Sequence, residues 1–197
     1  MLHINTKHCQ VNNSSVGNLN KISVNVGKKT SQPLNDTFLL EFNYEVTAAT
    51  SDYFSVKLNA EKGPFSTSNY RLQFQAVPLG EKKTFIKLIY SYEYGLPGRL
   101  AMQTYLATLG RGKIGFSKIN SGEKLIYVTG MRGAIERNIM RYYLAMEAHL
   151  ASLKHSPANR LHAKLQYWFD ATEEYSLQLH EMDRASYLAM KNTEFFR

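Results

Sequence analysis

The chain has one cysteine, Cys9, among 197 residues. One cysteine cannot close a disulfide within the chain, and it cannot anchor a metal site built from several cysteines. No apolar run approaches the roughly 18 residues that a membrane-spanning helix needs. The first ten residues, MLHINTKHCQ, contain no apolar core and no cleavage site, so we expect no signal peptide in the sequence as written. The protein is then expected in the cytoplasm, or in the periplasm if a leader upstream of Met1 has been lost.

Signatures of common enzyme and metal sites are absent as well. Neither G-x-S-x-G nor H-E-x-x-H occurs. The run GRGKIG at 110–115 has dinucleotide-binding spacing, but that motif must follow a strand and open a helix. Here a predicted helix precedes the run and a strand follows it, so we interpret it as a flexible turn. His3, His8 and Cys9 match no standard metal spacing. We predict exposed side chains there, no metal and no cofactor.

Runs of basic residues are also missing, although 24 Lys and Arg against 16 Asp and Glu give a net charge of +8. No basic run is longer than two residues, and neither an RNA-recognition signature nor zinc-finger spacing occurs. We therefore predict no specific nucleic-acid partner. Contact with an anionic membrane surface stays open, because a basic surface attracts anionic lipid.

Tyrosine is plentiful, with 13 Tyr beside 10 Phe. Tyrosine favours strands, so this richness indicates either an ordinary sheet or a tyrosine-lined cavity. Apolar and polar residues alternate in several segments, which predicts half-buried strands at 22–26, 38–46, 54–58, 70–76 and 83–94. Residues 1–10 form either a short strand or the end of a helix. Since short turns join the strands without intervening helices, we expect an antiparallel meander with one wet face.

Helical patterns dominate the rest of the chain. A short helix is predicted over 99–109 and a hairpin over 116–128. A long helix then runs from Met131 to Leu153. Its apolar residues recur every three or four positions and predict the buried stripe: Ile135, Ile139, Tyr142, Met146, Leu150 and Leu153. Pro157 stops that helix, and 159–196 is expected to be helical throughout.

Polar residues flank the predicted stripe in the first half of the long helix. Arg137, Asn138 and Arg141 either form a solvated face or reach the rim of a cavity. Burying such groups unpaired would cost several kcal/mol. At a rim they would therefore pair with one another, with Glu136 or with the headgroup of a ligand.

A family resemblance rests on two stretches, SYEYGLPGRLAMQTYLATLGRGKIGF and TGMRGAIERNIMRYYLAMEAHLASL. They resemble an uncharacterised proteobacterial branch of the START-like or Bet v 1-like superfamily, also called the helix-grip or polyketide cyclase and lipid-transport group. The likeness implies an α+β fold, in which a curved antiparallel β-sheet grips one long C-terminal α-helix. It covers about residues 1–155, and we expect the helical tail, residues 156–197, to be an extension outside the usual fold.

This fold normally begins with a strand and two short helices, which we expect to be missing before Met1. Their absence would leave a sheet edge open, through which a homodimer could form.

The resemblance also implies a function, although the superfamily shares no catalytic motif and transfers no catalytic residue. It implies a cavity between sheet and helix that takes a hydrophobic small molecule such as a lipid, sterol or polyketide. The expected ligand-binding residues are Tyr90, Tyr92, Tyr94, Arg137, Asn138, Arg141 and Tyr142. Tyrosine rings pack against an apolar ligand while their hydroxyls orient a polar group, and arginine holds an acidic headgroup.

Two other functions stay open at this point. A cyclase or hydrolase acting in the same cavity would need an acid or base within reach, for which Glu136 and Tyr92 are the candidates. A basic adaptor for membrane surfaces or nucleic acid would instead use the net charge. Its binding would fall steeply with salt and ignore apolar ligands.

Overall fold

The computed structural model describes residues 2–13, 20–108 and 110–195. It divides into two compact units, which we describe separately. The sheet unit is Asn5–Ala101, and the helical unit combines Met1–Ile4 with Met102–Arg197. Of the predicted helices, the last position of the short one, Leu109, and the end of the tail at Phe196 lie outside the described residues.

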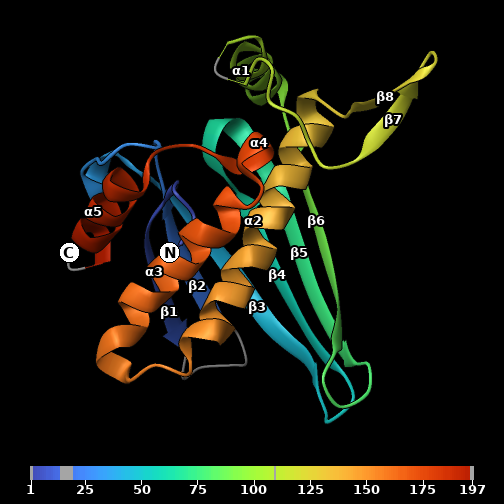
Figure 1. The fold of residues 1–197 in the computed structure, drawn as a ribbon. Helices are drawn as coiled ribbons and strands as arrows, with labels where there is room; N and C mark the ends of the chain where they lie inside the picture. The colour runs from blue at the N-terminus through green and yellow to red at the C-terminus, as the bar shows by residue number, and fades with distance from the viewer. Residues whose placement is uncertain (1, 14–19, 109, 196–197) are drawn as a thin grey trace. The chain divides into compact units, whose positions relative to one another are not determined.

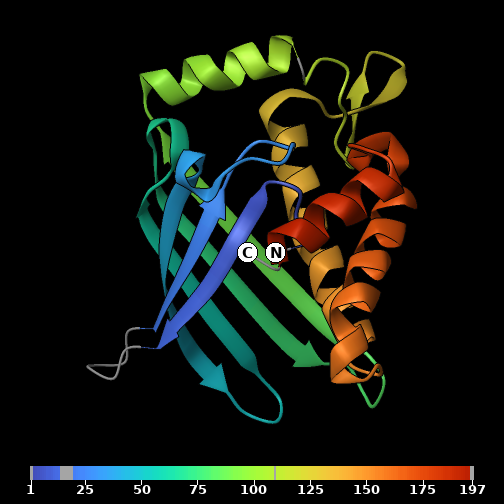
Figure 2. The same cartoon turned by 90° about the vertical axis from the view of Figure 1, so that its left-hand side faces the viewer.

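The sheet unit is an antiparallel meander in which each strand pairs with its neighbours in sequence (Figures 1 and 2). Its strands are β1 (Thr6–Asn13), β2 (Asn20–Val26), β3 (Phe38–Ala49), β4 (Phe54–Lys62), β5 (Thr67–Pro78) and β6 (Thr84–Tyr94). Two short 3-10 turns, η1 (Leu34–Asp36) and η2 (Pro64–Ser66), precede β3 and β5. The sheet is open, since β1 and β6 do not pair with each other among the described strands. The expected meander is confirmed, and residues 6–13 form a strand.

The alternation in the sequence becomes two distinct faces of this sheet. In the register, Leu40 pairs with Val24 and Leu58 pairs with Leu72, so apolar side chains share one face. The core of that face consists of Leu40, Phe42, Ala60 and Tyr70, with further apolar residues packed around them. The opposite face carries polar side chains such as Lys57 and Arg71, both exposed. The predicted wet face is therefore confirmed.

The helical unit consists mainly of helices, with one small hairpin. Helix α1 (Leu96–Ala107) begins in the sheet unit and ends in the helical unit. It is followed by β7 (Lys118–Ser121), β8 (Lys124–Tyr127), α2 (Gly130–Ser152), α3 (Pro157–Glu173), α4 (Ser176–Leu179) and α5 (Arg184–Phe195). Helices α2 and α3 lie side by side (Figure 1). Their core includes Leu144, Ala148, Leu165, Trp168 and Phe169, joined by Leu2. The predicted α+β class, with one long helix and further C-terminal helices, is confirmed.

The tail is not helical throughout, which corrects the prediction for 159–196. Helix α3 ends at Glu173, and the chain leaves helical geometry again between α4 and α5. Asp183 starts α5, because its carboxylate accepts hydrogen bonds from the backbone N–H of Ser186 (2.9 Å) and from the Ser186 hydroxyl (2.7 Å). The boundary expected at residue 155 falls between α2 and α3, which pack together in one unit. The division into 1–155 and 156–197 stays a prediction.

The buried face of α2 is not the predicted apolar stripe. The helix buries Gly133, Arg137, Arg141, Leu144, Ala148 and Ser152. In contrast, Leu150 and Leu153 of the predicted stripe are exposed. Gly133 packs closely against the backbone of Gly115 and Val128, and Ala148 lies in one core cluster with Leu165 and Trp168 of α3. Close packing of small residues, and not only apolar periodicity, thus sets the buried side. The length of the helix was predicted correctly, whereas its predicted stripe is only half-buried at Ile135, Ile139, Tyr142 and Met146.

No helix in the described part of the chain is long and apolar enough to cross a membrane.

Candidate functional site

The residues predicted to bind a ligand divide between the two units. Tyr90, Tyr92 and Tyr94 lie on β6 in the sheet unit. Arg137, Asn138, Arg141 and Tyr142 lie on α2 in the helical unit. That both sets line one cavity stays a prediction.

The three β6 tyrosines form a cluster with Tyr70 of β5, and we call these four residues the tyrosine cluster. The Tyr70 and Tyr92 rings stack with centroids 5.3 Å apart and planes 13° apart. Tyr92 also lies 5.5 Å from Tyr90 and 6.1 Å from Tyr94, with tilted planes. Sequence reasoning missed Tyr70, although its alternation with Leu72 and Phe74 had already placed it on the apolar face. The offset stacking of such rings is favourable beyond their area of contact.

Tyr70 is held in place by the chain that enters β5. Its hydroxyl shares a hydrogen bond of 2.6 Å with the hydroxyl of Thr67. Its ring lies over Gly63, where a Cβ atom would be 2.3 Å from Tyr70 Cε2. Only a residue without a side chain leaves room for this ring. Phe65 and Ser66, between these positions, adopt left-handed backbone angles of 55° and 58° in φ. Such angles are costly for these residues and are tolerated where the surroundings enforce them.

Two phenols of the cluster, those of Tyr70 and Tyr92, have raised pKa values and remain protonated at neutral pH. Burial raises the pKa of Tyr92, and the neighbouring Tyr70 and Tyr94 add to that shift. Burial also raises the pKa of Tyr70, while the hydrogen bond with Thr67 opposes the change. Protonated phenols can donate a hydrogen bond to a polar group of a ligand.

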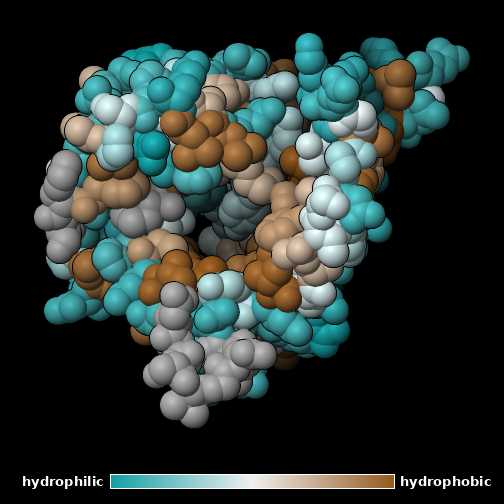
Figure 3. Space-filling model, turned by 90° about the horizontal axis from the view of Figure 1, so that it is seen from below, coloured by the Kyte–Doolittle hydropathy of each residue, from teal (hydrophilic) through white to brown (hydrophobic). Residues whose placement is uncertain are grey.

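Apolar side chains packed beside the cluster, among them Leu58 and Leu72, are only partly buried, and others farther along the same face are exposed. By register, Val46 and Phe54 lie on the same face as the cluster, yet they are 48% and 38% exposed. Phe38 is exposed to the same extent as Phe54. In the face of the molecule drawn in Figure 3, apolar residues gather at several places between hydrophilic ones.

The other face of the sheet has an open hollow of about 640 Å³. Polar side chains from β3 to β6 dominate its lining: Glu45, Lys57, Asn59, Asn69, Arg71, Gln73 and Ser91. Arg71 Nε donates to Asn69 Oδ1 (3.1 Å), and Asn69 Nδ2 donates to Glu93 Oε1 (2.6 Å). The size suits a small molecule, but the polar lining does not suit an apolar one.

In the helical unit, the predicted arginines are engaged by the protein itself. Arg141 Nη2 contacts Glu181 Oε1 at 2.7 Å, and Lys113 Nζ reaches the other oxygen, Oε2, also at 2.7 Å. Arg137 Nη1 donates to the Ile114 carbonyl (3.0 Å). Both arginines are buried, at 2% and 5% exposure for Arg137 and Arg141 respectively. A solvated face is therefore wrong for these two residues.

Glu181 is the partner that sequence reasoning did not identify, because it lies 40 positions beyond Arg141. Burial lowers the pKa of Arg141, while the Glu181 carboxylate opposes that shift and keeps the guanidinium charged. Asn138 and Tyr142 are half-buried on the same helix, and the Tyr142 ring lies 6.2 Å from the ring of His3.

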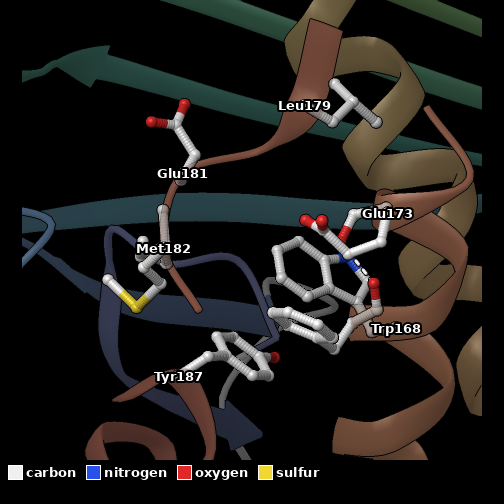
Figure 4. Close-up of a pocket in the computed structure, with 9 residues that line it drawn as sticks. Trp168, Glu173, Leu179, Glu181, Met182 and Tyr187 are labelled. Atoms are coloured by element: carbon white, nitrogen blue, oxygen red, sulfur yellow. Dashed lines mark hydrogen bonds between the residues drawn. The ribbon is translucent and has the colours of Figure 1, made fainter. Parts of the chain in front are cut away.

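Beside Glu181 the helical unit contains a small cavity of about 10 Å³. Trp168 and Tyr187, whose rings stack at 5.2 Å, line it together with Glu181, Met182 and Leu179 (Figure 4). A space of this size holds about one water molecule. It is far too small for a lipid or a polyketide.

His3 is not the exposed side chain that we expected. Burial, followed by the charges of Arg141 and Lys191, lowers the pKa of His3 to about 3. The imidazole is therefore neutral at physiological pH. In the described residues, no group of three or more His, Cys, Asp or Glu side chains comes close enough to hold a metal ion.

Glu136, a candidate catalytic base, has a structural role. Its Oε2 accepts hydrogen bonds from the backbone N–H groups of Phe116 (2.8 Å) and Ser117 (2.9 Å), and Arg132 Nε reaches Oε1 at 3.1 Å. Burial alone would raise the pKa of Glu136, but these hydrogen bonds outweigh it and lower the pKa. A carboxylate stabilised in its ionised form is a weak general base.

Comparison of the chain with protein-family models, with curated proteins and with solved structures found no match.

Proposed function

We propose that this protein binds a hydrophobic small molecule of the lipid, sterol or polyketide class through the apolar face of its sheet. The observation that carries the proposal is the tyrosine cluster, set among apolar side chains that remain partly exposed. The resemblance of the sequence to lipid-transport proteins points to the same class of ligand.

The chemistry of the cluster suits a ligand with an apolar body and one polar group. Four aromatic rings offer a broad apolar surface that needs little reordering, because each ring already packs against another. The protonated hydroxyls of Tyr70 and Tyr92 can donate to a carbonyl, hydroxyl or carboxylate of the ligand. The ligand would bind mainly through apolar contact, and hydrogen bonds would set its orientation.

An enzymatic function in this place has less support. Tyr92 has a raised pKa, so its phenol is a poor base at neutral pH. Glu136 is engaged with the backbone before β7. Binding without chemistry is therefore the function that the described residues favour.

The proposal is tested by titrating the protein, stripped of lipid, with a fluorescent polyene fatty acid. Tyr92→Ala should weaken binding by about tenfold, since a buried aromatic contact is worth more than 1 kcal/mol. Tyr92→Phe should retain most of the affinity. Lys57→Ala is the matched control, because Lys57 lies on β4, on the opposite face of the same sheet, and should leave affinity unchanged.

Native mass spectrometry and organic extraction of the unstripped protein complete the test. A released lipid, sterol or polyketide would identify the ligand class. An empty protein that also fails to bind the fatty acid would overturn the proposal, as would equal loss of binding in the Tyr92→Ala and Lys57→Ala variants.

A further inference from the structure

Strand β6 is an edge strand that lacks the proline residues and bulges which usually prevent an edge from pairing with another strand. It pairs with β5 on one side only, and its eleven residues, TFIKLIYSYEY, include no proline. The irregularity in the β5–β6 ladder, between Ser68 and Arg71, adds a residue on β5 and leaves β6 regular. The other edge, β1, has a register shift between Thr6 and His8. Proteins usually block a long edge with proline, bulges or several charges, because its free N–H and C=O groups pair readily with another strand.

Strand β6 also exposes apolar side chains on the otherwise polar face of the sheet. Phe85 and Ile89 point to that face and are 54% and 41% exposed. Both lie next to the edge, where a further strand would cover them. The edge therefore offers backbone hydrogen bonds and apolar contacts together.

The positions of the charged residues on β6 favour pairing with a second copy of the same strand in one particular register. The strand has two charged residues, Lys87 and Glu93, and both are exposed on the same face. When a strand pairs antiparallel with its own copy, a two-fold axis passes through one position of the strand. A residue that lies a given number of positions before the axis then faces, in the second copy, the residue that lies the same number of positions after it. The axis that places Lys87 opposite Glu93 passes through residue 90, midway between them. In that register both charges of each copy face an opposite charge. An axis through residue 87 would instead place the two Lys87 side chains opposite each other, and every remaining register within β6 places Lys87 opposite an uncharged residue.

We propose that β6 pairs antiparallel with β6 of a second copy, about a two-fold axis through Tyr90. Ile89 then lies diagonal to Ile89 of the second copy, and Leu88 lies opposite Tyr92 of that copy. The two Tyr90 side chains face each other across the axis. The dimer joins two sheets into one and closes the exposed edge of both, as an isologous two-fold contact does.

Pairing about this axis also makes the two apolar faces continuous. The tyrosine clusters of both copies lie on the same side of the joined sheet, because antiparallel pairing keeps opposite residues on one face. The dimer does not rest on the proposed function, since the argument uses the backbone edge of β6, its two charges and its exposed apolar residues Phe85 and Ile89. Its measurement needs no ligand, so either proposal can fail without the other.

Charge reversal tests the register directly. Sedimentation velocity of the wild-type protein over a wide concentration range should show a reversible monomer–dimer equilibrium. Lys87→Glu or Glu93→Lys alone should raise the dimer dissociation constant by about tenfold or more, because two attractive cross-strand pairs become repulsive. The double variant, Lys87→Glu with Glu93→Lys, should restore most of the affinity. Lys57→Glu, on β4 away from this edge, is the control and should not change it.

Disulfide trapping gives a second reading that does not depend on charge. In a Cys9→Ser background, Tyr90→Cys places two thiols opposite each other at the axis, within about 4.5 to 5.5 Å between Cα atoms, and oxidation should yield a covalent dimer. Leu88→Cys is the control, since residue 88 lies on the same face of the same strand. In the proposed register residue 88 faces residue 92 of the second copy, four positions away from residue 88 of that copy, so the two thiols should not cross-link.

A wild-type protein that stays monomeric throughout the concentration range would overturn the proposal. So would single and double charge reversals with equal effects, or equal cross-linking at positions 88 and 90. Growth into open-ended oligomers would overturn it as well, because it indicates pairing of β6 with β1 rather than with itself.

Discussion

The guanidinium of Arg141 and the carboxylate of Glu181 meet at 2.7 Å inside the helical unit, although 40 positions separate them in the chain. This pair joins α2 to the connection between α4 and α5. Trp168 on α3 donates its indole N–H to the backbone carbonyl of Arg141 at 3.3 Å, so three elements meet at one residue. Buried charges are stable only when they are paired, and the stability of the helical unit should depend on this contact.

Removing the carboxylate should therefore be costly. We expect Glu181→Ala to lower the free energy of unfolding by about 3 to 5 kcal/mol, because Arg141 and its charge stay buried without a partner. Glu173→Ala is the control, since Glu173 pairs with an exposed His180 and should cost less than about 1 kcal/mol. Urea unfolding followed by Trp168 fluorescence measures both. Similar losses in the two variants would mean that the Arg141–Glu181 pair is not a main support.

His3 should make the protein less stable in mild acid. Its folded pKa, about 3, is below the ordinary value of 6.5, so between these values the unfolded chain binds a proton that the folded chain does not. The stability from neutral His3 is complete above pH 6.5 and is lost as the pH falls towards 3, by up to about 1.4 kcal/mol per pH unit.

The measurement for His3 is urea unfolding between pH 7 and pH 5, where few carboxylates titrate. His3→Gln should flatten the dependence on pH relative to the wild type. His162→Gln, which changes an exposed histidine on α3, should keep the wild-type slope. If all three proteins show the same slope, the half-buried His3 does not govern it.

Gly63→Ala should disturb the tyrosine cluster by packing alone. The backbone of Gly63 is extended, with φ of −143°, so alanine meets no conformational strain there. Its Cβ would nevertheless lie 2.3 Å from the ring of Tyr70, which must move. We expect a loss of about 1 to 3 kcal/mol in stability and weaker binding of the fluorescent fatty acid.

Gly80→Ala provides the contrast for that experiment. Gly80 has φ of +71°, and a Cβ atom at this position would have no neighbouring atom within 4 Å, so alanine there meets strain but no clash. It should cost about 1 kcal/mol and leave fatty-acid binding unchanged. If Gly63→Ala and Gly80→Ala changed fatty-acid binding equally, the Tyr70 ring would not be part of the binding surface.

Tyr187→Phe should loosen the N-terminal residues. The Tyr187 hydroxyl donates to the Leu2 carbonyl at 2.9 Å, and both residues are buried. Loss of the hydroxyl leaves a buried carbonyl without this donor and should cost about 1 to 3 kcal/mol. Hydrogen exchange of residues 2–4 should become faster. Tyr175→Phe, at an exposed tyrosine, should leave that exchange unchanged.

The sequence predicted the sheet well because strand patterns are local. Residues such as Phe42 and Tyr44 alternate with polar neighbours, and the register follows from that alternation. The long helix was also predictable in its extent. Its buried side was not, because the burial of Arg137 and Arg141 depends on Ile114 and Glu181, which lie far away in the sequence. The small residues Gly133, Ala148 and Ser152, at helical spacing, were the signal for close packing that a search for apolar stripes misses.

The tyrosine site was predicted in part for the same reason. Tyr90, Tyr92 and Tyr94 stand out on one strand, whereas Tyr70 joins them only once β5 is aligned with β6. Its alternation with Leu72 would have indicated the shared face. The support from Gly63 and Thr67 could not be predicted, because it depends on an irregular turn with left-handed residues.

The anchoring of residues 2–4 on α5 has a consequence for synthesis on the ribosome. Lys191 donates to the His3 carbonyl at 2.8 Å and to Glu194 at 2.8 Å, while Tyr187 holds Leu2. Those partners are translated some 185 residues after the segment that they hold. The sheet unit, whose strands pair in order, can form while translation continues, whereas the helical unit must wait for α5. During that interval Leu2 and Ile4 have no core to enter, and a nascent chain stalled before α5 would present them to chaperones.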